Sequence, residues 1–338
     1  MNNNIYGIDL GTCNMKVFCK SSGKILNEKN TIAIINKNQM YAYGDAAYAM
    51  YEKAPENIHV TFPIVNGVIA DFNNVQTMIF EFLETNAKAK LHGAEYIVAV
   101  PTDITEVEKK AFFDLFYKSK TKPKNVLLCE KPIADAVGLG LDVNEPTGVM
   151  VVDIGADTTE ISVISLGGLV LSDLLHFGGN RIDESIINHI KRTYNLLIGQ
   201  KTAKQLKETL GSGLPGREDS MIVVGRDLVS GLPIELEINA QTVYEAIHDN
   251  LNSICNSIKM ILEKTPPELA RDIINSGIYI TGGGSQIENL DHLFTQITNI
   301  RVNICENPEE SVARGLIKIV SDEKYKRLTF NMKTRILR

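Results

Sequence analysis

Two hydrophobic patterns alternate along the chain: short apolar runs typical of buried strands, and longer stretches with apolar residues at helical spacing. In the first part the strands are expected at 5–9, 15–19, 31–35, 95–100 and 125–129, and the helices at 45–53, 74–88, from 103 and at 133–140. Asp103 with Glu106 has the spacing of a capping box, and Pro132 suits the first turn of a helix. The alternation of strands and helices predicts an α/β fold with a mainly parallel sheet.

After the polar segment 142–148 the pattern begins again. Strands are expected at 149–153, 161–165, 169–175, 277–280 and 301–304, a β-containing insertion at 221–238, and helices at 181–194, from 202, 240–264, 286–294 and 309–320. We therefore predict a first lobe over 1–144 with an insertion at about 24–72, and a second lobe over 145–313 with an insertion at about 180–240. Residues 314–338 form a C-terminal helix and basic tail that we expect to pack on the first lobe.

A repeat links the two lobes. The sequences IYGIDLGTCNMKVF (5–18) and MVVDIGADTTEISV (150–163) both read as apolar strand, Asp, apolar residue, Gly, small polar turn and apolar strand. Glycine lets the backbone approach a phosphate and point amides at it, and Thr12 or Thr158 can add a hydroxyl. Aspartates beside phosphates require a cation, and Mg²⁺ suits Asp9 and Asp153. The repeat predicts a duplicated core whose turns face a Mg²⁺-nucleotide.

A third glycine-rich turn, Thr281 to Ser285, follows a predicted strand and precedes a predicted helix. Such a setting allows close approach to an adenosine or a phosphate through Gly282, Gly283 and Gly284. Each glycine turn taken alone is more often an ordinary turn, so the prediction depends on finding all three in this order.

Composition argues against several classes of protein and site. A formal net charge of −6 argues against a general affinity for nucleic acid. Five cysteines without C-x-x-C spacing disfavour a disulfide framework and a zinc site, and six dispersed histidines give no reason to expect a metal other than Mg²⁺. The polar start MNNN and the lack of an apolar run of about 18 residues predict a cytoplasmic protein without a signal peptide or membrane span.

The chain resembles the MreB family of bacterial actins along nearly its whole length. The matching motifs are IDLGT, GVIADF, PTDITEVEKKA, EPTGVMVVDIG, ISLGG, RTYNLLIG, GRDLVSGLP, LEKTPPELA, TGGGS and ARG. The resemblance implies an actin-like, two-lobed fold of four subdomains with ATP or ADP and Mg²⁺ between the lobes. It also implies a cytoskeletal protein that assembles with itself into filaments of paired protofilaments, with other MreB paralogues as candidate partners.

The resemblance also carries over individual residues. Asp9 and Asp153 resemble the Mg²⁺-associated aspartates, and the phosphate loops correspond to Gly11, Thr12, Cys13 and Asn14 and to Gly155, Ala156, Asp157 and Thr158. Gly179 is assigned to the nucleotide as well. Lys16 falls where eukaryotic actins have a phosphate-contacting lysine, and an exposed strand lysine is the alternative. Lys207 and Glu208 align with purine-side and ribose-side residues.

Two positions depart from the family pattern. Where the family has Glu-Glu-Pro, with the second Glu polarising the attacking water, this chain has Glu130-Lys131-Pro132. A lysine cation accepts no hydrogen bond, so we expect weak ATP hydrolysis; Glu130 would point to the opposite face if the segment were extended. The second loop carries Asp157 in place of a glycine. We hypothesise an ion pair between Lys131 and Asp157 at the γ-phosphate position.

Three alternatives remain open from the sequence. The basic tail, with Leu328, Phe330, Met332, Ile336 and Leu337, either meets anionic lipid at the inner face of the membrane or is a plain solvated tail. An actin-fold small-molecule kinase is the rival function, and pelleting with ATP would separate it from a filament. The filament could guide wall synthesis or, as in wall-less helical bacteria, shape and motility.

Overall fold

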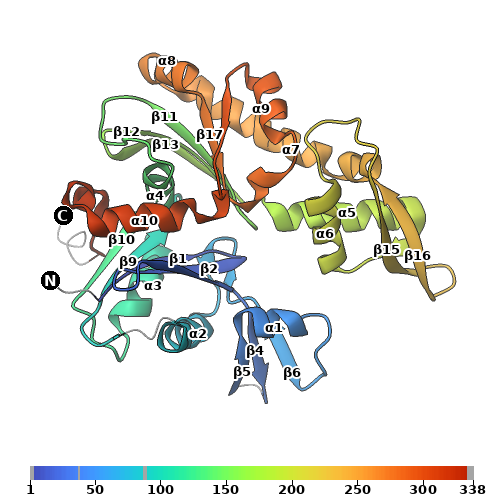
Figure 1. Cartoon of the computed structure of the whole chain (residues 1–338), viewed down its shortest axis with the longest axis horizontal. Coiled ribbons are helices and arrows are strands. Elements are labelled where there is room, and N and C mark those ends of the chain that lie inside the picture. Colours follow the sequence, from blue (N-terminus) through green and yellow to red (C-terminus); the bar gives the residue numbers. More distant parts are fainter. Residues whose placement is uncertain (1–3, 37–38, 87–89, 333–338) are drawn as a thin grey trace. The chain divides into compact units, whose positions relative to one another are not determined.

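The computed structural model describes residues 4–36, 39–86 and 90–332, and these form two compact units. Unit 1 contains residues up to 146, together with 164–170 and the segment from 309 onward. Unit 2 contains residues 147–163 and 171–308. Each unit has its own hydrophobic core, so the two are described separately (Figure 1).

Unit 1 is built on a six-stranded sheet in the order β19-β10-β9-β1-β2-β3. Its strands are β1 (Ile5–Leu10), β2 (Asn14–Cys19), β3 (Lys24–Lys29), β9 (Glu95–Val100), β10 (Asn125–Glu130) and β19 (Thr329–Phe330). β1, β9 and β10 run parallel, whereas β2 and β3 continue the sheet as antiparallel neighbours. The almost continuous burial of β1 and β9 fits strands covered on both faces.

Smaller elements complete unit 1. A three-stranded sheet in the order β5-β4-β6 and the β7–β8 hairpin lie in the first predicted insertion, although β3, at its start, belongs to the large sheet. These strands are β4 (Ile32–Ile35), β5 (Gln39–Tyr43), β6 (Ile58–Thr61), β7 (Ile64–Val65) and β8 (Val68–Ile69). The helices are α1 (Gly44–Met50), α2 (Phe72–Thr85), α3 (Glu106–Tyr117), α4 (Lys131–Gly138) and α10 (Ser311–Ser321), with the 3₁₀ turns η2 (Pro308–Glu310) at the boundary and η3 (Glu323–Leu328).

Unit 2 repeats the strand order of unit 1. Its main sheet is ordered β13-β12-β11-β17-β18, which matches β3-β2-β1-β9-β10, and β11, β17 and β18 run parallel. The strands are β11 (Val149–Ile154), β12 (Thr159–Ser165), β13 (Gly168–Leu175), β17 (Ile278–Thr281) and β18 (Val302–Ile304). The end of β12 and the start of β13 lie within residues 164–170, which are assigned to unit 1. The predicted repeat thus appears as a repeated sheet.

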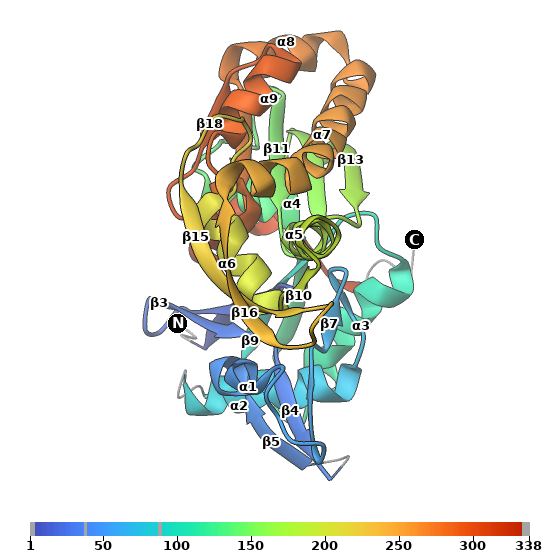
Figure 2. The same cartoon turned by 90° about the vertical axis from the view of Figure 1, so that its right-hand side faces the viewer.

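Helices and a second small sheet cover the rest of unit 2. The helices are α5 (Gly179–Tyr194), α6 (Gln200–Leu210), α7 (Ala240–Lys264), α8 (Pro267–Ser276) and α9 (Leu290–Thr298), with the 3₁₀ turn η1 (Gly283–Gln286). The small sheet is β14 (Leu196–Leu197), β15 (Ser220–Asp227) and β16 (Pro233–Asn239), and Figure 2 shows β15 and β16 as a long ribbon beside α5 and α6.

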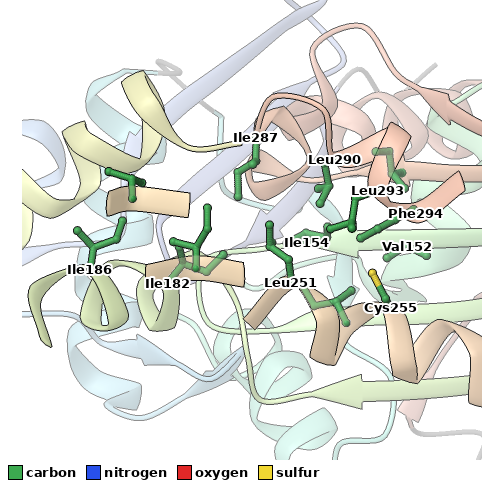
Figure 3. Packing of buried hydrophobic residues seen from close by; sticks show 14 of the residues in the cluster. Val152, Ile154, Ile182, Ile186, Leu251, Cys255, Ile287, Leu290, Leu293 and Phe294 are labelled. Atoms are coloured by element: carbon green, nitrogen blue, oxygen red, sulfur yellow. The ribbon is translucent and has the colours of Figure 1, made fainter. Parts of the chain in front are cut away.

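The core of unit 2 explains why α5 forms where it does. Ile182, Ile186 and Ile190 recur every four residues and are all fully buried, which gives α5 one apolar face. Figure 3 shows the first two of these in the same cluster as Val152 and Ile154 of β11. The buried face of α5 packs chiefly against α6, α7 and β14, within the same core that covers β11.

Local helix signals were misread in three places. The capping box of α3 is Thr105 with Glu108, while Asp103 adopts a positive φ of 55° and lies outside the helix. The predicted helix 286–294 is instead η1 followed by α9. Pro267 begins α8, a helix absent from the prediction, because proline is tolerated in a first helical turn.

The described part of the tail packs within unit 1, as expected for residues 314–338, and is neither a solvated nor a lipid-inserting segment. Leu328 and Met332 are 5% and 6% exposed, and Phe330 lies in β19, which pairs with β10. These residues therefore belong to unit 1 rather than to a solvated or lipid-inserting tail. Ile336 and Leu337 lie outside the described residues. Among the helices of the described residues, none has the length and apolar character needed to cross a bilayer.

Candidate functional site

The first glycine turn joins β1 to β2 in unit 1. The Gly11 amide donates to the Asn14 carbonyl at 3.0 Å, which closes the turn. A Cβ on Gly11 would lie 2.8 Å from that same oxygen, so only glycine fits without displacement. The sequence at this position is therefore constrained by the backbone itself.

The second glycine turn, in unit 2, is closed in the same way. The Gly155 amide donates to the Thr158 carbonyl at 2.8 Å, and a Cβ on Gly155 would lie 3.0 Å from that oxygen. Within the described residues, the amides of Thr12, Cys13 and Ala156 donate to no protein acceptor. Adjacent unpaired amides in a turn form a concave site suited to an anion.

A lysine lies beside the aspartate at the first turn. Asp9 and Lys16 are directly opposite on β1 and β2, and the Lys16 Nζ is 3.9 Å from the Asp9 Oδ2. Both residues are buried, with 5% and 7% of their surfaces exposed. The alternative of an exposed strand lysine is thus wrong, and a cation is present where β1 enters the turn.

Glu130 is the last residue of β10, and Lys131 follows it at the same edge of the sheet. The parallel register aligns Asp9 with Ala99 and Ala99 with Cys129, so β10 ends level with β1, two strands away. Glu130 has φ −64° and ψ 130° as the N-cap residue, and Lys131 is the first residue of α4. Glu130 is therefore extended, and Lys131 belongs to the helix that follows it.

The start of α5 holds the second turn. The amides of Gly179 and Asn180 donate to the carbonyls of Gly155 and Ala156 at 3.0 and 2.7 Å. The Asn180 Nδ2 also donates to the Asp157 Oδ1 at 2.7 Å. The approach is close enough that a Cβ on Gly178 would lie 2.6 Å from the Ala156 oxygen. Asp157, the departure from the family pattern, is thus hydrogen-bonded within its own unit.

Lys207 of α6 contacts the start of α5 through two groups. Its Nζ lies 2.8 Å from the Asp183 Oδ1 and donates to the Gly179 carbonyl at 2.9 Å. Burial raises the pKa of the Asp183 carboxyl, and Lys207 opposes that rise. Glu208, by contrast, is exposed, and its Oε1 lies 3.8 Å from the Nζ of Lys204 on the same helix. The two residues predicted on the purine and ribose sides therefore have very different surroundings.

The third glycine turn folds against the end of β11. Gly282 has φ +81°, and a Cβ there would lie 2.1 Å from the Asp153 Oδ1. A Cβ on Gly284 would meet Ile154, whereas Gly283 has open space around its Cα. The hydroxyl of Ser285 donates to the Gly282 carbonyl at 2.7 Å. Unit 2 therefore brings the second turn, the start of α5 and the third turn together around Asp153.

The carboxylates present suit Mg²⁺ better than a metal held by protein alone. Asp9 and Asp153 are 5% and 4% exposed, and each is the second-to-last residue of a strand that leads into a glycine turn. The described residues contain no group of three or more His, Cys, Asp or Glu side chains able to hold a metal. Mg²⁺ is commonly bound through one or two carboxylates, water and phosphate oxygens, which fits this set.

Several residues that hold the turns were not predicted. Asn30, Asn180 and Asp183 act from outside the glycine motifs, so no spacing within those motifs indicates them. A local signal did exist for one of them, because Gly178-Gly179-Asn180 directly precedes an amphipathic helix, a setting for close backbone approach at a helix start.

The sequence is similar to a known protein family over nearly its whole length. The family model described as MreB/Mbl protein matches residues 3–328. The chain is 40% identical over 312 residues to the cell shape-determining protein Mbl of Bacillus subtilis, which covers 91% of this chain and 93% of that protein.

Solved structures of related proteins have the same fold. MreB5 of Spiroplasma citri bound to AMPPNP superposes with a TM-score of 0.90 at 33% identity, over 96% of this chain and 97% of that one, and its ADP-bound structure with 0.89. MamK, solved as a double helical filament, gives 0.80 at 21% identity over 94% of this chain and 98% of that one, and supports the fold alone.

The repeated sheets and paired glycine turns define an α/β protein of the actin-like fold. Within that class, the chain belongs to the MreB/Mbl family.

Replacing Lys207 by Met is expected to destabilise unit 2 in a pH-dependent way. Asp183 would lose its cation while remaining buried, at a cost of about 3–5 kcal/mol in the free energy of unfolding near pH 8. The raised pKa of folded Asp183 means that the folded state binds the proton more tightly than the unfolded state. The cost should therefore shrink as pH falls toward the ordinary value of 3.8. Denaturant unfolding at pH 8 and pH 5.5 measures this difference.

The matched control is Lys191→Met, which removes an exposed lysine of α5 and should cost about 0–1 kcal/mol at either pH. Equal losses for Lys207→Met at the two pH values would contradict the assignment of Asp183 as its buried partner.

Proposed function

We propose that this protein is a cytoskeletal actin that binds Mg²⁺-ATP and polymerises into filaments that determine cell shape. The observation that carries the proposal is the pair of glycine turns, one in each unit, closed by equivalent hydrogen bonds and with amides available for phosphate. Structures of MreB5 with ADP and AMPPNP support an adenine nucleotide as the ligand.

In this proposal each unit supplies one phosphate turn. Gly11 to Asn14 and Gly155 to Thr158 donate amides, and the glycines of the third turn leave room for the adenosine. Asp9 and Asp153 hold Mg²⁺, which neutralises charge on the phosphates. Lys16 adds a positive charge at the first turn. Lys207, through the Gly179 carbonyl, positions the start of α5 rather than serving only the purine.

Hydrolysis is proposed to be slow. Lys131, the first residue of α4, occupies the family position of the water-polarising carboxylate, and an ammonium group cannot accept a proton from water. Asn180 keeps Asp157 within the second turn, where its charge would repel a γ-phosphate. An ion pair between Lys131 and Asp157 would lessen that repulsion, so ATP would bind and persist.

Restoring the carboxylate should restore turnover. Lys131→Glu, or Lys131→Glu with Asp157→Gly, is expected to raise the rate of phosphate release by at least tenfold, since a positioned general base contributes about 10²–10⁴-fold. Phosphate release under single-turnover conditions measures it. Lys110→Glu, an exposed charge reversal on α3, should leave the rate unchanged. The explanation fails if neither Lys131 variant is faster than the parent.

The β15–β16 ribbon offers a surface for self-association. Its outward face and tip expose an unusual amount of apolar surface for a monomer. The exposed fractions are Ile222 65%, Val224 59%, Leu228 42%, Val229 83% and Leu232 63%. A head-to-tail contact with a second copy would cover this surface and propagate as a filament.

Charge at the tip of this ribbon should prevent assembly. Val229→Asp with Leu232→Asp would place two carboxylates in a buried apolar interface, so the protein should remain in the supernatant on ultracentrifugation with ATP at concentrations at which the parent pellets. Nucleotide binding should be unchanged. Val107→Asp, at an equally exposed valine of α3, is the control and should pellet like the parent.

The cellular setting follows from the family. We propose a cytoplasmic filament, adjacent to the inner face of the membrane through partner proteins or paralogues, with a role in cell shape. Whether that role is exercised through wall synthesis or through motility depends on partners that the chain itself does not identify.

A further inference from the structure

Asn30 lies in the short link between β3 and β4 and is completely buried. Its side-chain Nδ2 donates to the Thr12 carbonyl at 2.8 Å and to the Ile64 carbonyl at 2.9 Å. Its backbone amide donates to the Cys13 carbonyl at 2.9 Å. One residue thus holds two successive carbonyls of the first glycine turn and joins them to β7.

These bonds set the direction of the turn's amides. In a planar trans peptide the carbonyl of one residue and the amide of the next point in opposite directions. When Asn30 holds the Thr12 carbonyl, the Cys13 amide must therefore point away from Asn30. That amide has no protein acceptor among the described residues, so it is available to an anion.

The side chain of Asn30 uses its two N–H donors and leaves its oxygen unpaired among the described residues. Its Oδ1 is buried and has no hydrogen-bond partner within the described part of the chain, which is an energetic cost. A flipped amide would place that oxygen against two carbonyls, so the geometry itself fixes the orientation. A buried amide that serves two carbonyls at the expense of its own oxygen is better explained by positioning than by packing.

We infer that Asn30 is a positioning residue for the β- and γ-phosphates of the bound nucleotide. It acts through the first turn and does not contact the ligand. The inference rests on the proposed function, because it assigns a role in the same site.

The β7–β8 hairpin is part of this arrangement. Asn66 and Gly67, with φ of 51° and 76°, form its tight turn, and the Gly67 amide donates to the Thr12 hydroxyl at 3.3 Å. The Ile64 carbonyl on β7 accepts from Asn30. The hairpin is therefore linked to the first turn directly through Gly67 and indirectly through Asn30. Ordering of the first turn by phosphate should therefore also protect the Gly67 amide from hydrogen exchange.

Asn30→Leu is the direct test, because leucine has a similar branched shape and removes both the donors and the unpartnered oxygen. Its melting temperature should stay within a few degrees of the parent. Loss of the two side-chain hydrogen bonds should weaken ATP binding by about tenfold. AMP lacks the β- and γ-phosphates, so its affinity should change less than twofold, and the ratio of the AMP and ATP dissociation constants should fall by nearly the same factor.

A second variant keeps the test valid if leucine unfolds unit 1. Asn30→Ala removes the donors without adding a charge or extra volume, and Asn73→Ala, exposed on α2, is the matched control. In the parent, ATP should protect the Gly67 amide more than AMP does, and both Asn30 variants should lose that difference.

Equal loss of ATP and AMP affinity in the Asn30 variants would overturn the inference, since Asn30 would then only maintain the fold. Unchanged affinity for both would overturn it as well. If the parent binds neither nucleotide, the proposed function itself fails, and this result is distinct from the other two.

Discussion

The hydrogen bond from a glycine amide to the carbonyl three residues later is the interaction on which the site depends. It occurs from Gly11 to Asn14 and from Gly155 to Thr158, and in each case a side chain on the glycine would crowd the accepting oxygen. Closing the turn in this way leaves neighbouring amides unpaired. The surrounding structure then orients them, through Asn30 in unit 1 and through the start of α5 in unit 2.

The parts of this account that could be predicted from sequence are those encoded locally. The repeated Asp-x-Gly turns predicted the duplicated core, and long apolar periodicity located helices such as α7. The surroundings of Lys16 and Lys207 could not be predicted, because each depends on a partner brought close by folding. The capping box of α3 was misplaced because Asp103 and Thr105 both have suitable residues three positions later, and only the backbone conformation separates them.

In both units a polar or charged side chain close to the glycine turn stabilises a carboxylate. Asp9 lies near Lys16 in unit 1, and Asp157 is hydrogen-bonded by Asn180 in unit 2. Buried or half-buried charges need such partners, since an isolated charge is costly to remove from water.

The central claim is that both glycine turns bind the same Mg²⁺-nucleotide, and calorimetric titration of Mg²⁺-ATP into the parent, Gly11→Val and Gly155→Val tests it most directly. The account predicts saturable binding of one ATP by the parent, and a loss of affinity of at least tenfold in each variant that still melts cooperatively. A parent without measurable binding, or a variant that binds ATP as tightly as the parent, would contradict it.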